Sequence, residues 1–249
     1  MKKYLFLSNS TKPSKKEYES KEKIFTTNFC KPCLEVAKEM GFEVYWGINR
    51  KYATEIENDL NVKMFDAFTF RNIFNIKDNY KAYKNIMNLL KEGDFEVIHC
   101  NTPIGGLLGR ICGKKAKINK VIYTAHGFHF YDGAPLIRNI IYKTAERVMA
   151  HWTDVIITIN QDDFEAAKKF HLKEKGKVYH IDGVGIEIQK FQSNENNRKK
   201  IISEMKLTND CILLISVGDL NRNKNNKIII NALKKVKNEK IHYLICGIG

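Results

Sequence analysis

Two histidines, His126 and His129, lie three residues apart among aromatic side chains in the segment YTAHGFHFYDGAP, residues 123–135. Imidazoles can bind a metal, transfer a proton or pack in a core. A zinc site needs a third protein ligand, and Asp132 is the one carboxylate close by, so we expect no metal here. His126 directly follows an apolar run and could hydrogen-bond a substrate hydroxyl or a sugar, whereas we expect His129 to support it from deeper in the aromatic cluster. The residues alone leave a functional and a structural role for His126 equally open.

Other polar side chains occupy comparable places, just after predicted strands. Ligands of open parallel sheets bind beyond the carboxyl ends of the strands, where loops and helix N-termini converge. Thr102 and Pro103 suit the first positions of a helix whose free amides would face the same crevice. The candidates for a cleft or acceptor site are His99, Asn101, Thr102, Gly127, Asp132 and Asn160.

Two glycine-containing segments could approach a phosphate. Gly105, Gly106 and Gly109 lack the lysine and hydroxyl of a phosphate loop and do not form the dinucleotide fingerprint, so we expect tight helix packing there. In SVGDLNRNK, Gly218 follows an apolar strand and Lys224 stands six residues later, at the entrance to a helix. Such a loop can hold a diphosphate or can be an ordinary solvated loop, and its spacing favours neither.

The chain has six cysteines, of which Cys30 and Cys33 form the motif CKPC. A thioredoxin-like motif would follow a buried strand, which the preceding SKEKIFTTNF does not provide, and no second Cys or His pair completes a zinc set. Pro32 suits the first turn of a helix, so we predict a helix start rather than redox or metal chemistry.

Strand-like and helical patterns alternate along the whole chain, which is typical of parallel α/β sheets. We predict a doubly wound, Rossmann-like domain over residues 1–190, a linker over 191–209, and the first strand, helix and strand of an incomplete second domain over 210–249. The predicted strands cover residues 3–8, 42–48, 62–68, 95–100, 120–125, 154–159, 177–181, 211–218 and 241–249, and the predicted helices cover 29–40, 78–92, 103–115, 135–152, 161–171 and 227–239.

The 249 residues include 42 Lys and Arg against 28 Asp and Glu, a formal net charge of +14. This charge is spread along the chain, which favours a solvated lysine-rich surface over a dedicated anion-binding face and makes nucleic acid an unexpected partner.

The sequence shows neither a membrane-spanning run nor a secretory signal, so we expect a cytoplasmic protein. Residues 135–152 carry apolar side chains at helical spacing among basic ones; we expect core packing, with an anionic membrane surface as the alternative.

Five segments together resemble the GT-B glycosyltransferases of family four, especially the bacterial enzymes of capsule and exopolysaccharide synthesis. They are DFEVIHCNTPIGGLLGR, KVIYTAHGFHFYDGAP, TDVIITINQDDFEAAKKF, GVGIEIQKF and ISVGDLNRNKNNKIIINALKK, and they follow the family's order across roughly residues 95–249. Residues 1–94 agree only in pattern. The resemblance implies two Rossmann-like domains, the first binding an acceptor and the second a nucleotide-diphosphate sugar.

The resemblance also implies a retaining transfer without a divalent metal or other cofactor, to a glycan acceptor that we expect to be lipid-linked. His126 matches the family histidine that contacts the donor sugar and is the catalytic candidate. Gly218 and Lys224 match the residues that hold the donor diphosphate; many relatives have an arginine directly after the glycine, where this chain has Asp219, and Arg222 is the candidate substitute. Positive charge there would offset the charge on the leaving nucleotide diphosphate. A lipid-linked acceptor fits a peripheral position on the inner face of the cytoplasmic membrane.

Two features of the family are missing from the sequence. SNSTKPSKK replaces the glycine-rich loop that often follows the first strand, and the family's glutamate pair would lie beyond Gly249. We therefore expect a C-terminally truncated glycosyltransferase that is inactive as a fragment. The alternatives are a sugar-nucleotide epimerase of the same architecture and a non-catalytic module that binds a membrane or another anionic partner.

Overall fold

The computed structural model describes residues 1–9, 24–25, 29–49, 56–57, 60–67, 72–186 and 188–247. The chain divides into two compact units, residues 1–186 and residues 187–249. The division lies close to the domain boundary predicted at residue 190. The segment 191–209, predicted as a linker, contains a helix of ten residues, α7 (Glu195–Glu204).

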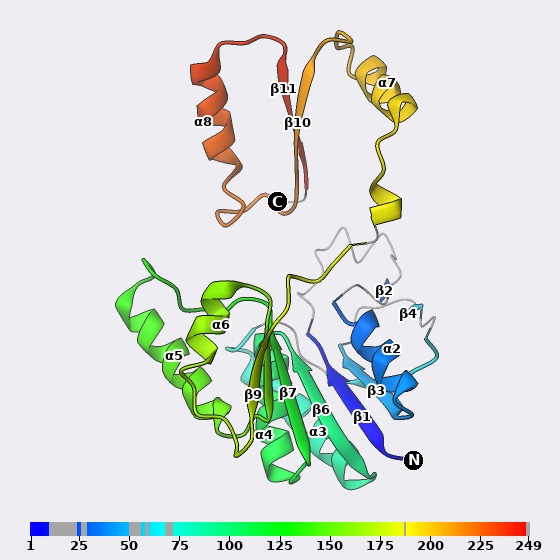
Figure 1. Ribbon diagram of the computed structural model, residues 1–249, viewed down its shortest axis with the longest axis vertical. Helices are drawn as coiled ribbons and strands as arrows, with labels where there is room; N and C mark the ends of the chain where they lie inside the picture. The colour runs from blue at the N-terminus through cyan, green and yellow to red at the C-terminus, as the bar shows by residue number, and fades with distance from the viewer. Residues whose placement is uncertain are drawn as a thin grey trace. The chain divides into compact units, whose positions relative to one another are not determined.

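Unit 1 is built on a seven-stranded parallel sheet, as the alternating sequence pattern predicts (Figure 1). The strand order is β5-β3-β1-β6-β7-β8-β9, so the winding direction reverses between β1 and β6. This reversal is the topological switch point of a doubly wound sheet. The strands are β1 (Lys3–Leu7), β3 (Glu43–Ile48), β5 (Lys63–Asp66), β6 (Phe95–Asn101), β7 (Lys120–Ala125), β8 (Val155–Thr158) and β9 (Lys177–His180), and a separate short pair joins β2 (Ile24–Phe25) to β4 (Ile56–Glu57).

Helices cover both faces of this sheet and match the predicted helices within a few residues. One face packs against α2 (Lys31–Glu39), which begins directly after Cys30 and has Pro32 in its first turn, as predicted from CKPC. The opposite face packs against the helices that follow β5, β6, β7 and β8. These are α3 (Ile76–Lys91), α4 (Pro103–Lys115), α5 (Leu136–Ala150) and α6 (Gln161–Ala167).

Side-chain alternation along β6 decides which of its residues meet which helices. Ile98 and Cys100 are buried in the core beneath α3 and α4, whereas Val97 is buried in the core beneath α2. His99 and Asn101 follow Val97 at intervals of two and therefore belong to the α2 face. The polar end of this strand thus lies on the face that α2 covers.

The glycines of α4 serve close packing, as predicted. A Cβ atom added to Gly106 would lie 2.4 Å from the Tyr123 ring, and one added to Gly109 would lie 2.2 Å from Cys100 Sγ. Both distances are far shorter than a van der Waals contact. The helix can approach β6 and β7 this closely because these positions carry no side chain.

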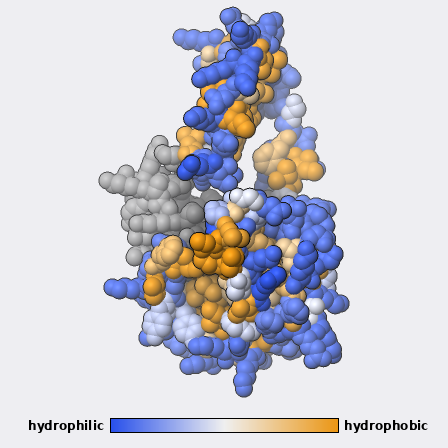
Figure 2. Space-filling view, turned by 90° about the vertical axis from the view of Figure 1, so that its left-hand side faces the viewer, coloured by the Kyte–Doolittle hydropathy of each residue, from blue (hydrophilic) through white to orange (hydrophobic). Residues whose placement is uncertain are grey.

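The core role predicted for residues 135–152 is wrong for most of the apolar residues of α5. Met149 and Ala150 are buried, but Ile137 and Ile141 are 74% and 60% exposed. Figure 2 faces the side on which α5 lies in Figure 1, and hydrophobic surface gathers there among hydrophilic residues. Only one side of α5 packs against the rest of unit 1. The apolar periodicity of its sequence did not reveal that most of its apolar side chains are exposed.

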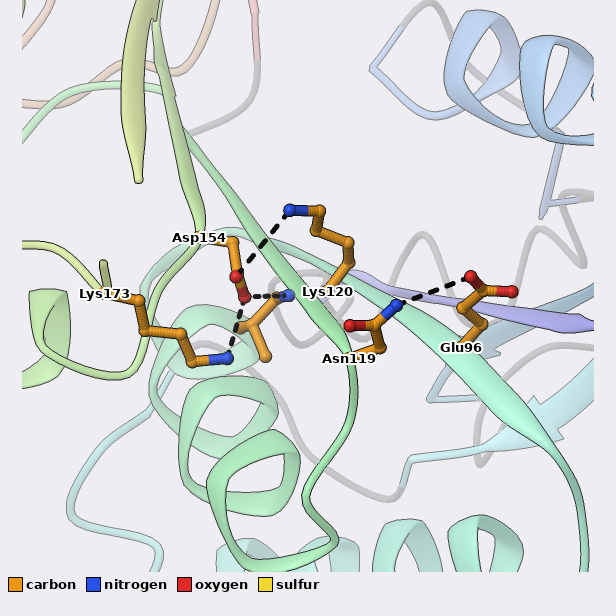
Figure 3. A network of polar contacts seen from close by, with 6 residues as sticks. Glu96, Asn119, Lys120, Asp154 and Lys173 are labelled. Atoms are coloured by element: carbon orange, nitrogen blue, oxygen red, sulfur yellow. Dashed lines mark hydrogen bonds and ion pairs between the residues drawn. The ribbon is translucent and has the colours of Figure 1, made fainter. Parts of the chain in front are cut away.

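A polar network ties together the amino ends of the central strands (Figure 3). Asp154, directly before β8, accepts a hydrogen bond from the backbone N–H of Val121 at 2.8 Å and pairs with Lys173 at 2.8 Å. Lys120 lies 3.9 Å from the same carboxylate, and Asn119 donates to Glu96 at 3.5 Å. In a parallel sheet the amino ends lie at the edge opposite the switch-point crevice, so this network holds strands in place and takes no part in the candidate site.

Unit 2 contains the predicted strand, helix and strand, with α7 and a short 3-10 helix, η1 (Ile188–Phe191), before them. The strands β10 (Ile212–Val217) and β11 (Ile241–Cys246) are parallel and are joined through α8 (Asn226–Val236). The Tyr243 hydroxyl lies 2.7 Å from Ser216 Oγ and 3.1 Å from Asn226 Oδ1, which links both strands to the start of α8. Across the described part of the chain, no helix combines the length and apolar character that crossing a membrane requires.

Candidate functional site at the carboxyl edge of the sheet

The carboxyl ends of β1 and β6 meet at the switch point through Asn9 and Thr102. The Asn9 backbone N–H donates to Thr102 Oγ1 at 3.2 Å, and both residues are buried. Gly105 lies against the same contact, because a Cβ atom there would come within 2.8 Å of Asn9 Oδ1. The first turn of α4 therefore begins directly at the edge where ligands of doubly wound sheets bind.

Thr102 holds a backbone conformation that is otherwise almost confined to glycine, with φ 67° and ψ 159°. It occupies the N-cap position of α4, as predicted, but its side chain makes no capping hydrogen bond. The hydroxyl instead contacts Asn9 Oδ1 and the main-chain oxygen of Asn101. Such a conformation costs about 1–3 kcal/mol and persists where neighbouring contacts enforce it, which marks this strand end as preorganised.

His126 and Asn101 are brought together from the ends of two neighbouring strands. The imidazole Nε2 of half-buried His126 hydrogen-bonds to Asn101 Oδ1. Asn101 Nδ2 donates to the carbonyl oxygen of Phe29 at 3.4 Å, and the Phe29 ring meets the imidazole edge-on with 5.1 Å between centroids. Residues following β7, ending β6 and preceding α2 thus converge around one imidazole.

His99 does not line this crevice, which corrects its prediction as a cleft residue. It is 4% exposed, and its ring nitrogens contact the Tyr4 hydroxyl at 2.6 Å and the Thr124 hydroxyl at 2.7 Å. Burial, followed by the neighbouring His126, lowers the pKa of His99 to about 3. The ring is therefore neutral at physiological pH and links β1, β6 and β7 beneath the site.

The loop after His126 is held in place by α6. The backbone N–H of Phe128 donates to Asp163 Oδ2 at 3.0 Å, and Asn160 Nδ2 donates to the same oxygen at 2.7 Å. Asn160, predicted as a cleft residue, also caps α6 by accepting from the Asp163 N–H at 2.8 Å. Gly127 permits the turn, because its φ of 127° is one that side-chain-bearing residues rarely adopt.

The aromatic residues of this loop make two separate sets of contacts. The Phe128 ring is stacked on Phe130 with 5.0 Å between centroids, and both contact Phe170. His129 was expected deep in this cluster, but it is exposed and contacts Tyr142 of α5 at 5.2 Å between centroids. Asp132 lies in the exposed turn that leads to α5.

The predicted diphosphate loop of unit 2 is compact. Gly218 has a φ of 147°, and a Cβ atom there would lie 3.3 Å from Lys224 Cε, so the lysine side chain passes close over this backbone. Asn221 Oδ1 accepts a hydrogen bond from the Lys224 backbone N–H at 3.1 Å, which closes the loop before α8. Arg222 and Lys224 are both exposed. The loop presents two exposed cations beside a glycine.

The cysteines of CKPC are placed for packing. Cys30 is buried, and burial raises the pKa of Cys33 to about 11, so this thiol is protonated and weakly nucleophilic at neutral pH. Within the described ranges, the His, Cys, Asp and Glu side chains form no group of three or more that could hold a metal ion.

Three residues of the site were not predicted from the sequence. Asn9 is polar but buried two residues after β1, Phe29 reaches the site from 72 residues before Asn101, and Asp163 holds the His126 loop. Asp163 had a detectable signal, because Asn160 and an acidic residue three positions later form a capping-box pattern. No signal in the sequence identified Asn9 or Phe29, because their place in the site follows from the order of the strands in the sheet.

The parallel sheet, its switch point and the ligand-facing strand ends define unit 1 as a Rossmann-like α/β domain. Residues 20–160, more than half of the chain, match the family model described as "Glycosyl transferase 4-like". The chain belongs to this family.

Curated relatives and solved structures extend this similarity. The chain is 30% identical over 213 residues to "Putative glycosyltransferase EpsD" of Bacillus subtilis (strain 168), covering 84% of this chain and 54% of that protein. It is 29% identical over 182 residues to "UDP-Gal:alpha-D-GlcNAc-diphosphoundecaprenol alpha-1,3-galactosyltransferase" of Escherichia coli, covering 72% and 46%. The chain thus spans about half the length of these relatives.

Among solved structures, sucrose-phosphate synthase of Thermosynechococcus elongatus has a TM-score of 0.69 at 14% identity, over 99% of this chain and 62% of that one. UDP-N-acetylglucosamine 2-epimerases also share the fold, at low sequence identity. Likeness at these identities shows the fold alone.

Proposed function

We propose that this protein is a retaining glycosyltransferase that transfers a sugar from a nucleotide-diphosphate sugar to a glycan acceptor in capsule or exopolysaccharide synthesis. The match of residues 20–160 to the glycosyl transferase 4-like family carries the proposal. The names of two relatives support it, since one is called a glycosyltransferase and the other a galactosyltransferase acting on UDP-Gal and a diphosphoundecaprenol-linked sugar. By extension, the acceptor proposed here is lipid-linked.

In this proposal His126 contacts the donor sugar. Its half-buried ring is oriented by Asn101 at the carboxyl edge of the sheet, beside the switch point where ligands of this fold class bind. A fixed imidazole in contact with the sugar loses little freedom when the reaction proceeds, which favours the transition state.

Gly218, Lys224 and Arg222 are proposed to hold the donor diphosphate. Gly218 carries no side chain, and the Lys224 side chain passes close to its backbone. Two cations at this loop would offset the charge that develops on the departing nucleotide diphosphate, without a divalent metal. Replacing Lys224 with Ala should weaken binding of UDP-sugars roughly tenfold, whereas Lys227→Ala, an exposed lysine one turn later, is the matched control. Equal losses in both variants would argue against the assignment.

The proposed place of action is the cytoplasmic side of the membrane, because a lipid-linked acceptor is confined to a bilayer while a nucleotide sugar is freely soluble. The sugar-nucleotide epimerase alternative would consume the donor with no acceptor at all. The two functions therefore differ in whether product formation depends on lipid.

The test is transfer of labelled sugar from a panel of nucleotide-diphosphate sugars to undecaprenyl-diphosphate-linked N-acetylglucosamine. It is made with this chain and with any longer polypeptide whose reading frame contains it. A labelled lipid product with a retained anomeric configuration is expected from a polypeptide whose donor-binding domain is complete. Conversion of the nucleotide sugar to an epimer without added lipid would overturn the proposal in favour of the epimerase.

A further inference from the structure

The exposed side of α5 carries an apolar stripe that is interrupted at Thr144. Successive residues of a helix are separated by about 100° around its axis, so Ile137, Ile140, Ile141 and Val148 fall within one arc. Their exposed fractions are 74%, 55%, 60% and 47%. Met149 and Ala150 are buried on the opposite side and attach the helix to the domain.

Basic side chains border this stripe on both sides. By the same spacing, Lys143 and Arg147 flank one edge of the arc and Arg138 flanks the other, and all three are exposed. The single acidic residue of the helix, Glu146, points toward the domain and pairs with fully buried Arg110 at 2.8 Å. All of α5 is described, and its outer surface carries three cations and no exposed carboxylate. Figure 2 shows this side of the molecule, with hydrophobic surface among hydrophilic residues.

The helix is fixed rigidly to the loop that carries His126. Asn139 Oδ1 accepts from the backbone N–H of Tyr131 at 3.1 Å, and Asn139 Nδ2 donates to the Tyr131 carbonyl at 2.9 Å. Tyr131 is itself 56% exposed, directly before the helix. Whatever binds the α5 stripe is therefore held next to the carboxyl edge of the sheet.

We propose that α5 docks this protein onto an anionic lipid bilayer, with its isoleucines entering the interface and its three cations contacting lipid headgroups. An apolar stripe with basic borders is the arrangement that binds an anionic membrane surface in plane. A second copy of this chain fits less well, because pairing two stripes would bring the basic borders of both copies together. This inference rests on the proposed function in one respect: docking there would present a lipid-linked acceptor to the His126 edge.

The test is cosedimentation of the full 249-residue chain with extruded vesicles that contain neither acceptor nor nucleotide sugar. Binding is expected to vesicles of phosphatidylcholine with 30% phosphatidylglycerol and not to pure phosphatidylcholine, and to weaken with salt. The double variant Arg138→Glu/Arg147→Glu should bind anionic vesicles at least roughly tenfold more weakly. The matched control is Lys234→Glu/Lys235→Glu on α8, which changes the net charge equally and should bind almost like the parent chain.

A second double variant, Ile137→Ser/Ile141→Ser, tests the apolar part and should also lose binding, since both side chains are exposed and their replacement spares the core. Equal binding of the α5 and α8 charge variants would overturn the proposal. So would sedimentation velocity showing a dimer that the serine variant abolishes, with no vesicle binding by the parent chain. Because the vesicles hold no substrate, failure to bind is distinguishable from failure of glycosyl transfer.

Discussion

Asn101 Oδ1 accepts a hydrogen bond from His126 Nε2 at the carboxyl edge of the sheet. The orientation of this amide is fixed independently, because Oδ1 also accepts from the Thr102 N–H at 3.1 Å and Nδ2 donates to Phe29. An amide oxygen cannot donate, so Nε2 of His126 must carry the hydrogen. A buried amide thus selects the tautomer and the direction of the one imidazole proposed to meet a sugar.

This relationship predicts that activity and stability respond differently at the two positions. In a polypeptide that carries out the transfer, His126→Ala should lower glycosyl transfer roughly 100-fold. It should change the free energy of unfolding by less than about 1 kcal/mol, since Asn101 Oδ1 keeps its Thr102 donor. Asn101→Ala should lower transfer and also cost about 2 kcal/mol in the free energy of unfolding, because it leaves the N–H of buried Thr102 and the His126 imidazole without this partner. Transfer assays and urea unfolding measure the two effects. Full transfer by His126→Ala would remove this residue from the proposed site.

Gly109→Ala should destabilise unit 1, because the added methyl group would meet Cys100 Sγ at 2.2 Å. We expect a loss of about 2 kcal/mol in the free energy of unfolding after the gain in helix propensity is counted. The double variant Gly109→Ala/Cys100→Ala removes the clashing sulfur. Urea unfolding of both single variants and the double variant should show a favourable coupling of at least about 1 kcal/mol. Strict additivity would mean that the clash is relieved elsewhere.

The buried Arg110–Glu146 pair should be costly to break from one side. Arg110 is completely buried, stacks 3.9 Å from the Tyr123 ring centre and pairs with Glu146 at 2.8 Å. Glu146→Ala leaves the guanidinium without its counter-charge and should cost about 3 kcal/mol. Arg110→Met/Glu146→Leu removes both charges and should recover most of that loss in thermal or urea unfolding. A double variant less stable than Glu146→Ala would contradict this account.

Acid should destabilise unit 1 through His99. The folded-state pKa is about 3 and the ordinary value is about 6.5, so between these values the unfolded chain binds a proton that the folded chain excludes. Neutral His99 therefore makes its full contribution to the free energy of unfolding above about pH 6.5. Acidification removes this contribution, by about 2 kcal/mol between pH 7 and pH 5.

Unfolding of the parent chain and of His99→Gln at both pH values measures this effect. The parent chain should lose more stability than the variant over that interval. Imidazole NMR signals of His99 that titrate near pH 6 in the folded chain would rule out the explanation.

The strands and helices could be predicted because their periodicity is local. The placement of His126 beyond a strand end followed from the apolar run before it. His126 meets Asn101 because β6 and β7 are parallel neighbours, so their carboxyl ends lie side by side. His99 was misplaced because β6 is covered on both faces, so its sequence lacks the alternation that would separate buried from crevice-facing positions. The exposure of α5 was missed because core helices and interfacial helices share one apolar periodicity.

The order of elements, the parallel α/β class, the close packing of the α4 glycines and the family could all be inferred from the sequence. The three-dimensional packing was needed to show that Asn9, Phe29 and Asn101 surround the switch point, that His99 is buried beneath it, and that α5 turns a basic-bordered apolar stripe outward. Burial and hydrogen bonding depend on which distant segments pack together, and a local pattern carries no information about this. The local sequence pattern sets whether a segment forms a helix or a strand, but the segments packed around it set what each of its side chains can do.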